Sequence, residues 1–191
     1  MNDHARQKAE LREKLRFRRT AHVKAMPQWE REIAFAHIPH PLRDALGAAG
    51  NVAVYCAVGA ECDLSKLTSE FEARGLAIAK PRHADRDDTM RFHRWRSGDP
   101  LEAGPFGVPQ PHSDAPEVAP ELILCPLVGF DRALNRLGQG GGHYDRAFAA
   151  HPGAKRVGVA WSVQEVDALP LEAWDIPLNA VLTEREWIAA S

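Results

Sequence analysis

The sequence predicts an α/β fold, namely an open, mostly parallel sheet flanked by helices in a Rossmann-like three-layer arrangement, with an additional N-terminal helix. Short apolar, β-branched runs alternate along the chain with segments of helical periodicity. One strand–helix–strand unit fits into about 30 residues, the size of a βαβ unit with parallel strands. No internal repeat interrupts this alternation, so residues 1–191 are expected to form a single domain.

The N-terminal part of the chain is expected to be helical. Residues 2–22 are rich in helix-forming and basic side chains, which predicts a basic helix that packs on the domain through one thin apolar edge. The apolar positions are Ala9, Leu11, Leu15 and Phe17. A second helix is expected over residues 28–48, which end in the helix terminator Gly47.

The βαβ unit follows directly. Residues 51–58 form a continuous apolar run, which is typical of a buried strand. Residues 63–75 have apolar side chains at helical spacing, Asp63 as an N-cap and Gly75 as a terminator, and they predict the crossover helix. Residues 76–80 then predict the next strand, parallel to the first.

The second half of the chain predicts the rest of the sheet. Residues 89–95 indicate a hairpin-like excursion, and residues 97–120 are so rich in Pro and Gly that a long irregular loop is expected. Residues 121–130 predict a strand that runs into a turn. The remaining expected elements are a helix from Gly142 to His151 and strands over residues 155–161 and 179–184.

The composition limits the classes of function. With 24 Lys and Arg against 26 Asp and Glu, the net charge is −2, so no broad positive field is expected to attract nucleic acid or an acidic membrane. No run approaches the ~20 apolar residues of a membrane span. Cys56, Cys62 and Cys125 lack a metal or redox spacing, which favours free thiols in the cytoplasm. A monomer acting on small molecules is the expected state.

Residues 136–146, RLGQGGGHYDR, combine glycines with titratable side chains. Glycines between a strand and a helix let the backbone approach a ligand and present N–H groups at the positive end of the helix dipole, where phosphate binds. Arg136 can add a charge-assisted hydrogen bond, and Asp145 can hold a divalent cation that bridges phosphate oxygens. The spacing matches neither a dinucleotide-binding fingerprint nor a Walker loop. A flexible capping loop is the alternative, but the position after a strand favours a phosphate site.

The longer stretch over residues 125–146, CPLVGFDRALNRLGQGGGHYDR, resembles the signature of the 5-formyltetrahydrofolate cyclo-ligases, also called 5,10-methenyltetrahydrofolate synthetases. Three other blocks agree with the family in order and spacing, and together they cover nearly the whole chain. These blocks are residues 8–12 with the following Arg18 and Arg19, residues 55–63, and residues 167–184.

The resemblance implies that ATP and Mg²⁺ drive the closure of 5-formyltetrahydrofolate to 5,10-methenyltetrahydrofolate, with release of ADP and phosphate. Because the folate supplies its own nucleophile, the protein mostly positions groups and neutralises charge. Two alternatives stay open: a sugar-phosphate or phosphate-ester enzyme of similar fold, and a non-catalytic folate- or nucleotide-binding protein. Asp145 and Asp175 favour the Mg·ATP enzyme, because a sugar-phosphate binder needs no such carboxylates.

The resemblance also implies residues for the nucleotide and the metal. Lys8 and Arg12 lie four apart on one helix face and are implied to reach the phosphates, whereas Arg18 and Arg19 are expected to be surface charges. Asp145 and Asp175 are the implied Mg²⁺ ligands, and Arg136 and Asp145 the implied catalytic residues. Asp131 is a weaker candidate that instead can shape a turn. The other implied nucleotide-binding residues are Gly138, Gly140, Gly141, Gly142, His143 and Tyr144.

The implied folate-binding residues come from separate segments. Glu61 is implied to accept hydrogen bonds from the amino-pyrimidine part of the pterin, with a helix-start charge as its alternative. Cys56 is implied to be a pocket wall or a core thiol, and Phe106 an aromatic platform or an anchor for the long loop. Gln139 and His143 complete the set. Gln139 stands where many relatives have a basic residue or another side chain, which leaves open one contact to phosphate or to the glutamate tail. His143 replaces a tyrosine and can bring pH dependence.

Overall fold

The structure is a computed structural model that describes residues 3–47, 50–85, 89–105 and 107–190. Within these residues, seven strands form one sheet, whose five central strands run parallel while the two edge strands pair antiparallel. The predicted open, mostly parallel sheet is therefore confirmed. In spatial order the strands are β11 (Trp187–Ala189), β10 (Ala180–Leu182), β9 (Lys155–Val159), β6 (Leu122–Pro126), β1 (Asn51–Ala53), β2 (Ala77–Arg82) and β3 (Arg91–Arg94).

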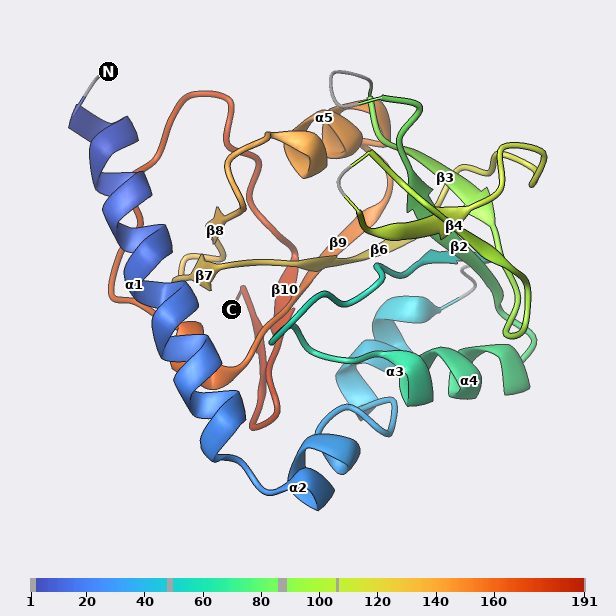
Figure 1. Cartoon of the computed structure of the whole chain (residues 1–191), viewed down its shortest axis with the longest axis horizontal. Coiled ribbons are helices and arrows are strands. Elements are labelled where there is room, and N and C mark those ends of the chain that lie inside the picture. The colour runs from blue at the N-terminus through green and yellow to red at the C-terminus, as the bar shows by residue number, and fades with distance from the viewer. Residues whose placement is uncertain (1–2, 48–49, 86–88, 106, 191) are drawn as a thin grey trace.

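Helices cover both faces of this sheet, which Figure 1 shows nearly edge-on. Successive strand residues point to opposite faces, so Leu124 packs with Leu67 and Phe71 on one side, whereas Ile123 packs with Phe148 on the other. The predicted three-layer arrangement is confirmed. The helices are α1 (Asp3–Ala25), α2 (Gln28–Ile33), α3 (His40–Leu46), α4 (Ser65–Ala73) and α5 (His143–Ala150), and a short 3-10 helix, η1, covers Ser162–Gln164.

One predicted helix and one predicted strand differ from the structure. The helix expected over residues 28–48 is divided into α2 and α3, and the part at 48 lies outside the described residues. Pro39 has an extended backbone, with φ −66° and ψ 153°, and so separates the two helices. The strand expected over residues 51–58 pairs in the sheet only over β1, because the chain then leaves the sheet at its carboxyl edge.

The loop expected over residues 97–120 contains regular structure. β4 (Leu101–Ala103) and β5 (Pro109–Pro111) form a small antiparallel sheet, in which the prolines are tolerated because each strand is an edge. Gln110 ties this hairpin to the end of β2, since its side-chain amide accepts from the backbone N–H of His83 and donates to the His83 carbonyl, both at 3.1 Å. A second ribbon follows β6 and consists of β7 (Gly129–Phe130) and β8 (Arg136–Leu137).

α1 crosses the end of the sheet where β6 leads into β7 and β8 (Figure 1). Leu15 is completely buried against Val128 and Leu137 of this region. The prediction that α1 packs through an apolar edge that includes Ala9 and Phe17 is wrong for these two residues. Ala9 is exposed, and the exposed fraction of Phe17 is 77%. The reason is that the inward face of α1 is shared between Leu15 and basic side chains.

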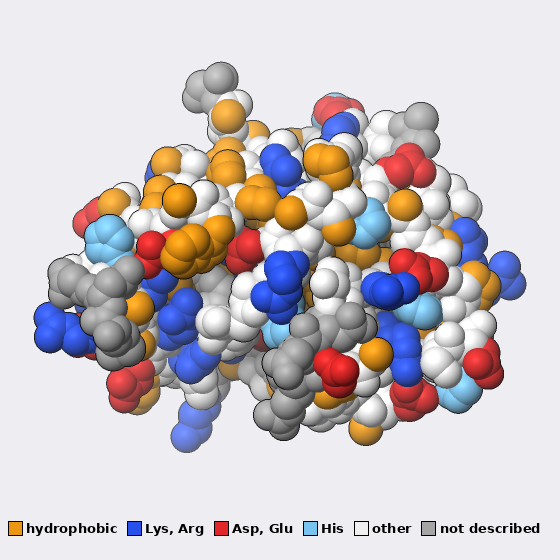
Figure 2. All heavy atoms as spheres, turned by 90° about the horizontal axis from the view of Figure 1, so that it is seen from above, with side chains coloured by type: hydrophobic (Ala, Val, Ile, Leu, Met, Phe, Trp, Pro, Cys, Tyr) orange, Lys and Arg blue, Asp and Glu red, His pale blue; other side chains and the backbone are white. Residues whose placement is uncertain are grey.

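Charged side chains of both signs are interspersed over the face of the molecule that Figure 2 shows. Among the described residues, no helix has both the length and the apolar character needed to cross a bilayer. Attraction for an anionic ligand therefore has to come from local groups of cations and not from the protein as a whole.

We predict that Gly129→Ala loosens the docking of α1. A Cβ atom at this position overlaps Cδ1 of Leu15, so either the leucine or the helix has to move. The expected loss is about 1–3 kcal/mol in the free energy of unfolding, measured by urea denaturation. Gly153→Ala is the matched control, since its Cβ meets no atom of the described structure within 4 Å. Equal stability of the two variants contradicts the prediction.

Candidate functional site

A cavity of about 780 Å³ opens at the carboxyl ends of β1, β2 and β6. The chain continues from β1 toward β2 on one side and from β6 toward β9 on the other, so the cavity lies where the strand order reverses, the usual ligand site of open α/β sheets. Phe106 lies outside the described residues, and apart from the weaker candidate Asp131 the structure brings the other predicted site residues together around this cavity. They are Lys8, Arg12, Cys56, Glu61, Arg136, Gly138, Gln139, Gly140, Gly141, Gly142, His143, Tyr144, Asp145 and Asp175.

The glycine stretch connects β8 to the amino end of α5. Gly142 precedes the helix with φ +64°, a left-handed conformation that glycine adopts without a steric penalty. Gly138 leaves room for the Arg136 guanidinium, because a Cβ atom here would lie 2.7 Å from Nη1. The positive end of the α5 dipole therefore faces a cavity wall that is open enough for the backbone to approach phosphate.

Two hydrogen-bonded ion pairs lie in the cavity wall. Arg136, whose side chain is only 4% exposed, donates from Nη2 to Oδ1 of Asp145 at 2.8 Å. Lys8 donates from Nζ to Oδ2 of Asp175 at 2.5 Å, and the same oxygen accepts the backbone N–H of Glu172 at 2.8 Å. The first pair joins β8 to α5, and the second joins α1 to the loop before β10.

The two carboxylates each have one uncommitted oxygen. Oδ2 of Asp145 and Oδ1 of Asp175 make no hydrogen bond to the described part of the chain. Mg²⁺ prefers such oxygens and usually takes one or two carboxylates together with phosphate oxygens and waters. Over the described ranges, no group of three or more His, Cys, Asp or Glu side chains is arranged to hold a metal. The donors present therefore fit a Mg²⁺ ion that binds together with a nucleotide.

Arg12 lies along the glycine stretch. Its Nε donates to the Gly138 carbonyl at 2.8 Å, and its guanidinium borders Gly140. Burial and the neighbouring Arg16 lower the pKa of Arg12, while Asp175 raises it. An arginine stays protonated in proteins, so this side chain remains a cation at the place predicted for phosphate.

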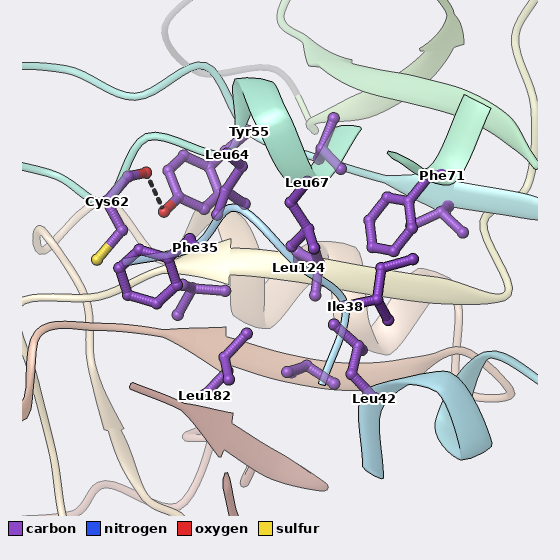
Figure 3. Packing of buried hydrophobic residues seen from close by; sticks show 14 of the residues in the cluster. Phe35, Ile38, Leu42, Tyr55, Cys62, Leu64, Leu67, Phe71, Leu124 and Leu182 are labelled. Atoms are coloured by element: carbon purple, nitrogen blue, oxygen red, sulfur yellow. Dashed lines mark hydrogen bonds between the residues drawn. The ribbon is translucent and has the colours of Figure 1, made fainter. Parts of the chain in front are cut away.

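The loop after β1 holds Glu61 in the cavity wall, next to Gln139 of the glycine stretch. The Tyr55 hydroxyl donates to the Cys62 carbonyl at 2.7 Å, which fixes the loop next to Glu61 (Figure 3). The Glu61 carboxylate accepts the backbone N–H of Val58 at 3.0 Å. Burial raises the pKa of Glu61, and the Val58 N–H and the Arg19 guanidinium oppose this effect.

The prediction that Arg18 and Arg19 are surface charges is wrong for Arg19. This residue is 8% exposed, lines the cavity, and places Nη1 3.9 Å from Oε1 of Glu61. Arg18 is half-buried and donates to the Glu165 carbonyl at 2.7 Å, away from the cavity. The sequence did contain a signal that Arg19 faces the site, because Lys8, Arg12 and Arg19 are spaced so that they share one face of α1.

Gln139 bridges α1 and Glu61. Its Oε1 accepts from Nε and Nη2 of Arg16 at 3.0 and 2.6 Å, and its Nε2 donates to Oε1 of Glu61 at 3.4 Å. Position 139 carries glutamine and no basic side chain, but the structure places the exposed guanidinium of Arg16 directly beside it. Arg16 was not among the predicted site residues.

His143 starts α5 and faces the ring of His83, with ring centroids 4.6 Å apart. Burial lowers the pKa of His143 from its ordinary value, and His83 and Arg146 lower it further. The imidazole is therefore uncharged at neutral pH, and the pH dependence expected from it moves to more acidic conditions.

Three other predicted residues have clear environments. Cys56 is half-buried in the cavity wall as a free thiol. Burial raises the pKa of Tyr144 well above its ordinary value, which keeps the phenol neutral. Asp131 does not line the cavity, and its carboxylate accepts hydrogen bonds at 3.0 Å from Asn135 and from the backbone of Leu169. Asp131 thus shapes the turn between β7 and β8, which was the predicted alternative to a role in the metal site.

Comparison with known sequences finds the family that the motifs resemble, and the match extends over almost the whole chain. The sequence model of the 5-formyltetrahydrofolate cyclo-ligase family matches residues 4–184. The chain is 31% identical to the 5-formyltetrahydrofolate cyclo-ligase of Haemophilus influenzae over 141 residues, which cover 70% of this chain and 75% of that protein. It is 33% identical to the enzyme of the same name from Escherichia coli K12 over 149 residues, covering 73% and 82%.

A solved structure agrees with the sequence relatives. The NMR structure of Aquifex aeolicus 5,10-methenyltetrahydrofolate synthetase is similar to this chain with a TM-score of 0.76 and 28% identity. The match covers 95% of this chain and 92% of that one. With the family matched from end to end and the same fold in a relative, the chain belongs to the 5-formyltetrahydrofolate cyclo-ligase family.

Proposed function

We propose that the protein converts 5-formyltetrahydrofolate and ATP into 5,10-methenyltetrahydrofolate, ADP and phosphate in a Mg²⁺-dependent reaction. One observation carries this proposal: a single cavity unites the glycine stretch, the basic face of α1, two carboxylates and Glu61. We further propose that it acts as a cytoplasmic monomer on these small molecules, without nucleic acid or membrane. The free cysteines and the near-zero net charge support this part of the proposal.

The nucleotide half of the cavity supplies the groups that phosphoryl transfer requires. The amino end of α5 and the glycine stretch offer backbone N–H groups to the phosphates, and Lys8 and Arg12 add positive charge from α1, with Arg12 directly beside the glycine stretch. Arg136 is held next to Asp145, where it can stabilise charge that develops on the transferred group. Mg²⁺ bound by Asp145 and Asp175 would neutralise phosphate charge there.

The folate half of the cavity has a different task. Attack of the formyl oxygen on the terminal phosphorus of ATP releases ADP and makes that oxygen a good leaving group. N10 of the same folate then attacks the formyl carbon, the phosphate leaves, and N10 loses its proton. Because both reacting groups belong to the substrate, Glu61 and the cavity walls need only orient the pterin so that N10 lies near the formyl carbon.

Ligand binding requires an exchange of the two ion pairs. Lys8 and Arg136 are neutralised by Asp175 and Asp145, the same residues that are predicted to bind the metal. ATP alone would place phosphates beside both carboxylates, whereas Mg²⁺ with ATP supplies a cation for the carboxylates and anions for Lys8 and Arg136. The charges of the cavity therefore favour joint binding over binding of either ligand alone.

The two alternative functions are less well supported. A sugar-phosphate binder needs no carboxylates beside the glycine stretch, and the chain belongs to the 5-formyltetrahydrofolate cyclo-ligase family, which does not carry that function in its name. A non-catalytic folate- or nucleotide-binding protein would have the same cavity, so turnover has to separate it from an enzyme.

We predict that the purified protein with 5-formyltetrahydrofolate, ATP and Mg²⁺ produces the ultraviolet absorbance of the methenyl product. Chelation of Mg²⁺ is expected to abolish this signal, because the carboxylates then repel the phosphates. Equilibrium binding of ATP and of the folate is measured in parallel. Binding without product favours the non-catalytic alternative, and absence of binding by either ligand contradicts the proposed function.

Asp145→Asn is expected to fold, with lower stability because the buried Arg136 loses its counter-charge, and to lower kcat about 100-fold or more, since the variant loses the charge that holds Arg136 and the cation. Steady-state kinetics and circular dichroism provide the measurements. Asp167→Asn is the matched control, because Asp167 is exposed and does not line the cavity. Wild-type activity of Asp145→Asn removes this residue from the site.

Removal of both carboxylates is expected to reverse the metal dependence of ATP binding. In the wild type, calorimetry should show that ATP without Mg²⁺ binds at least about tenfold more weakly than with it, because like charges meet in the cavity. In the double variant Asp145→Asn/Asp175→Asn, metal-free ATP should bind more tightly than it does to the wild type. An unchanged ratio in the double variant shows that the two aspartates do not bind the cation.

A further inference from the structure

Arg19 is a cation in an unusual position. Its side chain is 9% exposed and that of the neighbouring Glu61 is 10% exposed, with Nη1 3.9 Å from Oε1. Nη1 also lies 3.4 Å from the Leu127 carbonyl, which accepts its hydrogen bond. Nε has no hydrogen-bond partner in the described part of the chain. A buried, incompletely paired guanidinium is a poor source of stability, so its place in the cavity wall points to a role in the site.

The surroundings of Glu61 leave Arg19 with a defined electrostatic effect. Within the described ranges, the cation that lies within 4 Å of the Glu61 carboxylate is Arg19. The carboxylate also accepts hydrogen bonds from the Gln139 amide and from the Val58 N–H. Burial raises the pKa of Glu61, whereas Arg19 lowers it. The other titratable groups that face Glu61 have a pKa raised by burial and stay neutral; they are Tyr55, Cys62 and Tyr144.

We infer that Arg19 is a positioning residue that keeps Glu61 ionised and aimed into the cavity, so that affinity for the reduced folate depends on a side chain that acts through Glu61. This inference rests on the proposed function, in which Glu61 accepts hydrogen bonds from the pterin. The Glu61 carboxylate can accept from both the ring and the amino N–H groups, whereas a protonated Glu61 presents an O–H donor to those donors. Binding of the folate, and not of ATP, is therefore the step that responds to Arg19.

The first test separates the two substrates. Arg19→Gln is expected to raise the KM for 5-formyltetrahydrofolate about tenfold. The KM for ATP and kcat should change less than about twofold, because the ion pairs near the phosphates are untouched. Arg19→Lys, which retains the charge, should recover most of the affinity, and Arg19→Met provides a second neutral variant of similar length. Circular dichroism and thermal unfolding verify that each variant is folded.

Arg18→Gln is the matched control, because Arg18 is the next residue of the same helix and its hydrogen bond to Glu165 points away from the cavity. Its KM for the folate should equal that of the wild type. If Arg18→Gln and Arg19→Gln have the same effect, or if Arg19→Gln raises the KM for both substrates equally, Arg19 is only a structural residue and the inference is wrong.

A double-mutant cycle tests whether Arg19 acts through Glu61. Glu61→Gln removes the charge on which Arg19 is inferred to act, so adding Arg19→Gln should cause little further loss of folate affinity. Fully additive effects of the two substitutions overturn the inference.

The last test needs no substrate. NMR of protein labelled with ¹³C-glutamate, with the Glu61 signal assigned from Glu61→Gln, reports the protonation of Glu61 directly. Loss of the cation destabilises the carboxylate, so in Arg19→Gln the pKa of Glu61 should rise. As the pH falls, folate affinity should be lost at a higher pH than in the wild type. An unchanged titration overturns the inference even if the wild type is an active cyclo-ligase, whereas an inactive wild type contradicts only the proposed function.

Discussion

The cavity depends on how closely α1 approaches the end of the sheet. Leu15 is fully buried against Val128 and Leu137, and the absence of a side chain at Gly129 lets it come this near. Burying one leucine contributes about 1.5–3 kcal/mol, which helps to offset the cost of placing cations on the same helix face. Through this contact α1 brings Lys8 to Asp175, and it forms the wall that closes the site.

The charges of the site are balanced in pairs before any ligand is considered. Lys8 is hydrogen-bonded to Asp175 and Arg136 to Asp145, in a wall that is largely shielded from water. Such pairs are costly to break by removing one partner, but they can be exchanged for another set of matched charges. In the proposed function, a nucleotide with its metal would provide such a set, which would allow a protein with a net charge of −2 to hold a strongly anionic ligand.

Three regions have a local sequence pattern that is compatible with more than one secondary structure, and only the structure shows which one forms. Pro39 breaks a helical pattern that the flanking residues would continue, and the strand that begins at β1 leaves the sheet because its later residues turn to the cavity. The small sheet of β4 and β5 was expected to be an irregular loop, since its edge strands contain proline. Pro39 acts locally and β4 pairs with the neighbouring β5, so among these differences only the extent of β1 involves partners far along the chain, namely β2 and β6.

The sequence by itself determined the α/β class, the alternation of strands and helices, and the residues of the glycine stretch, because hydrophobic periodicity and glycine content are local properties. The family motifs also named the cavity residues, from Lys8 to Asp175. Only the tertiary structure decided that Arg19 is buried beside Glu61 and that Arg16 meets Gln139. A basic residue in a helix looks the same in the sequence whether it faces water or a carboxylate. The partner of Arg19 is supplied by the loop after β1, more than 40 residues away.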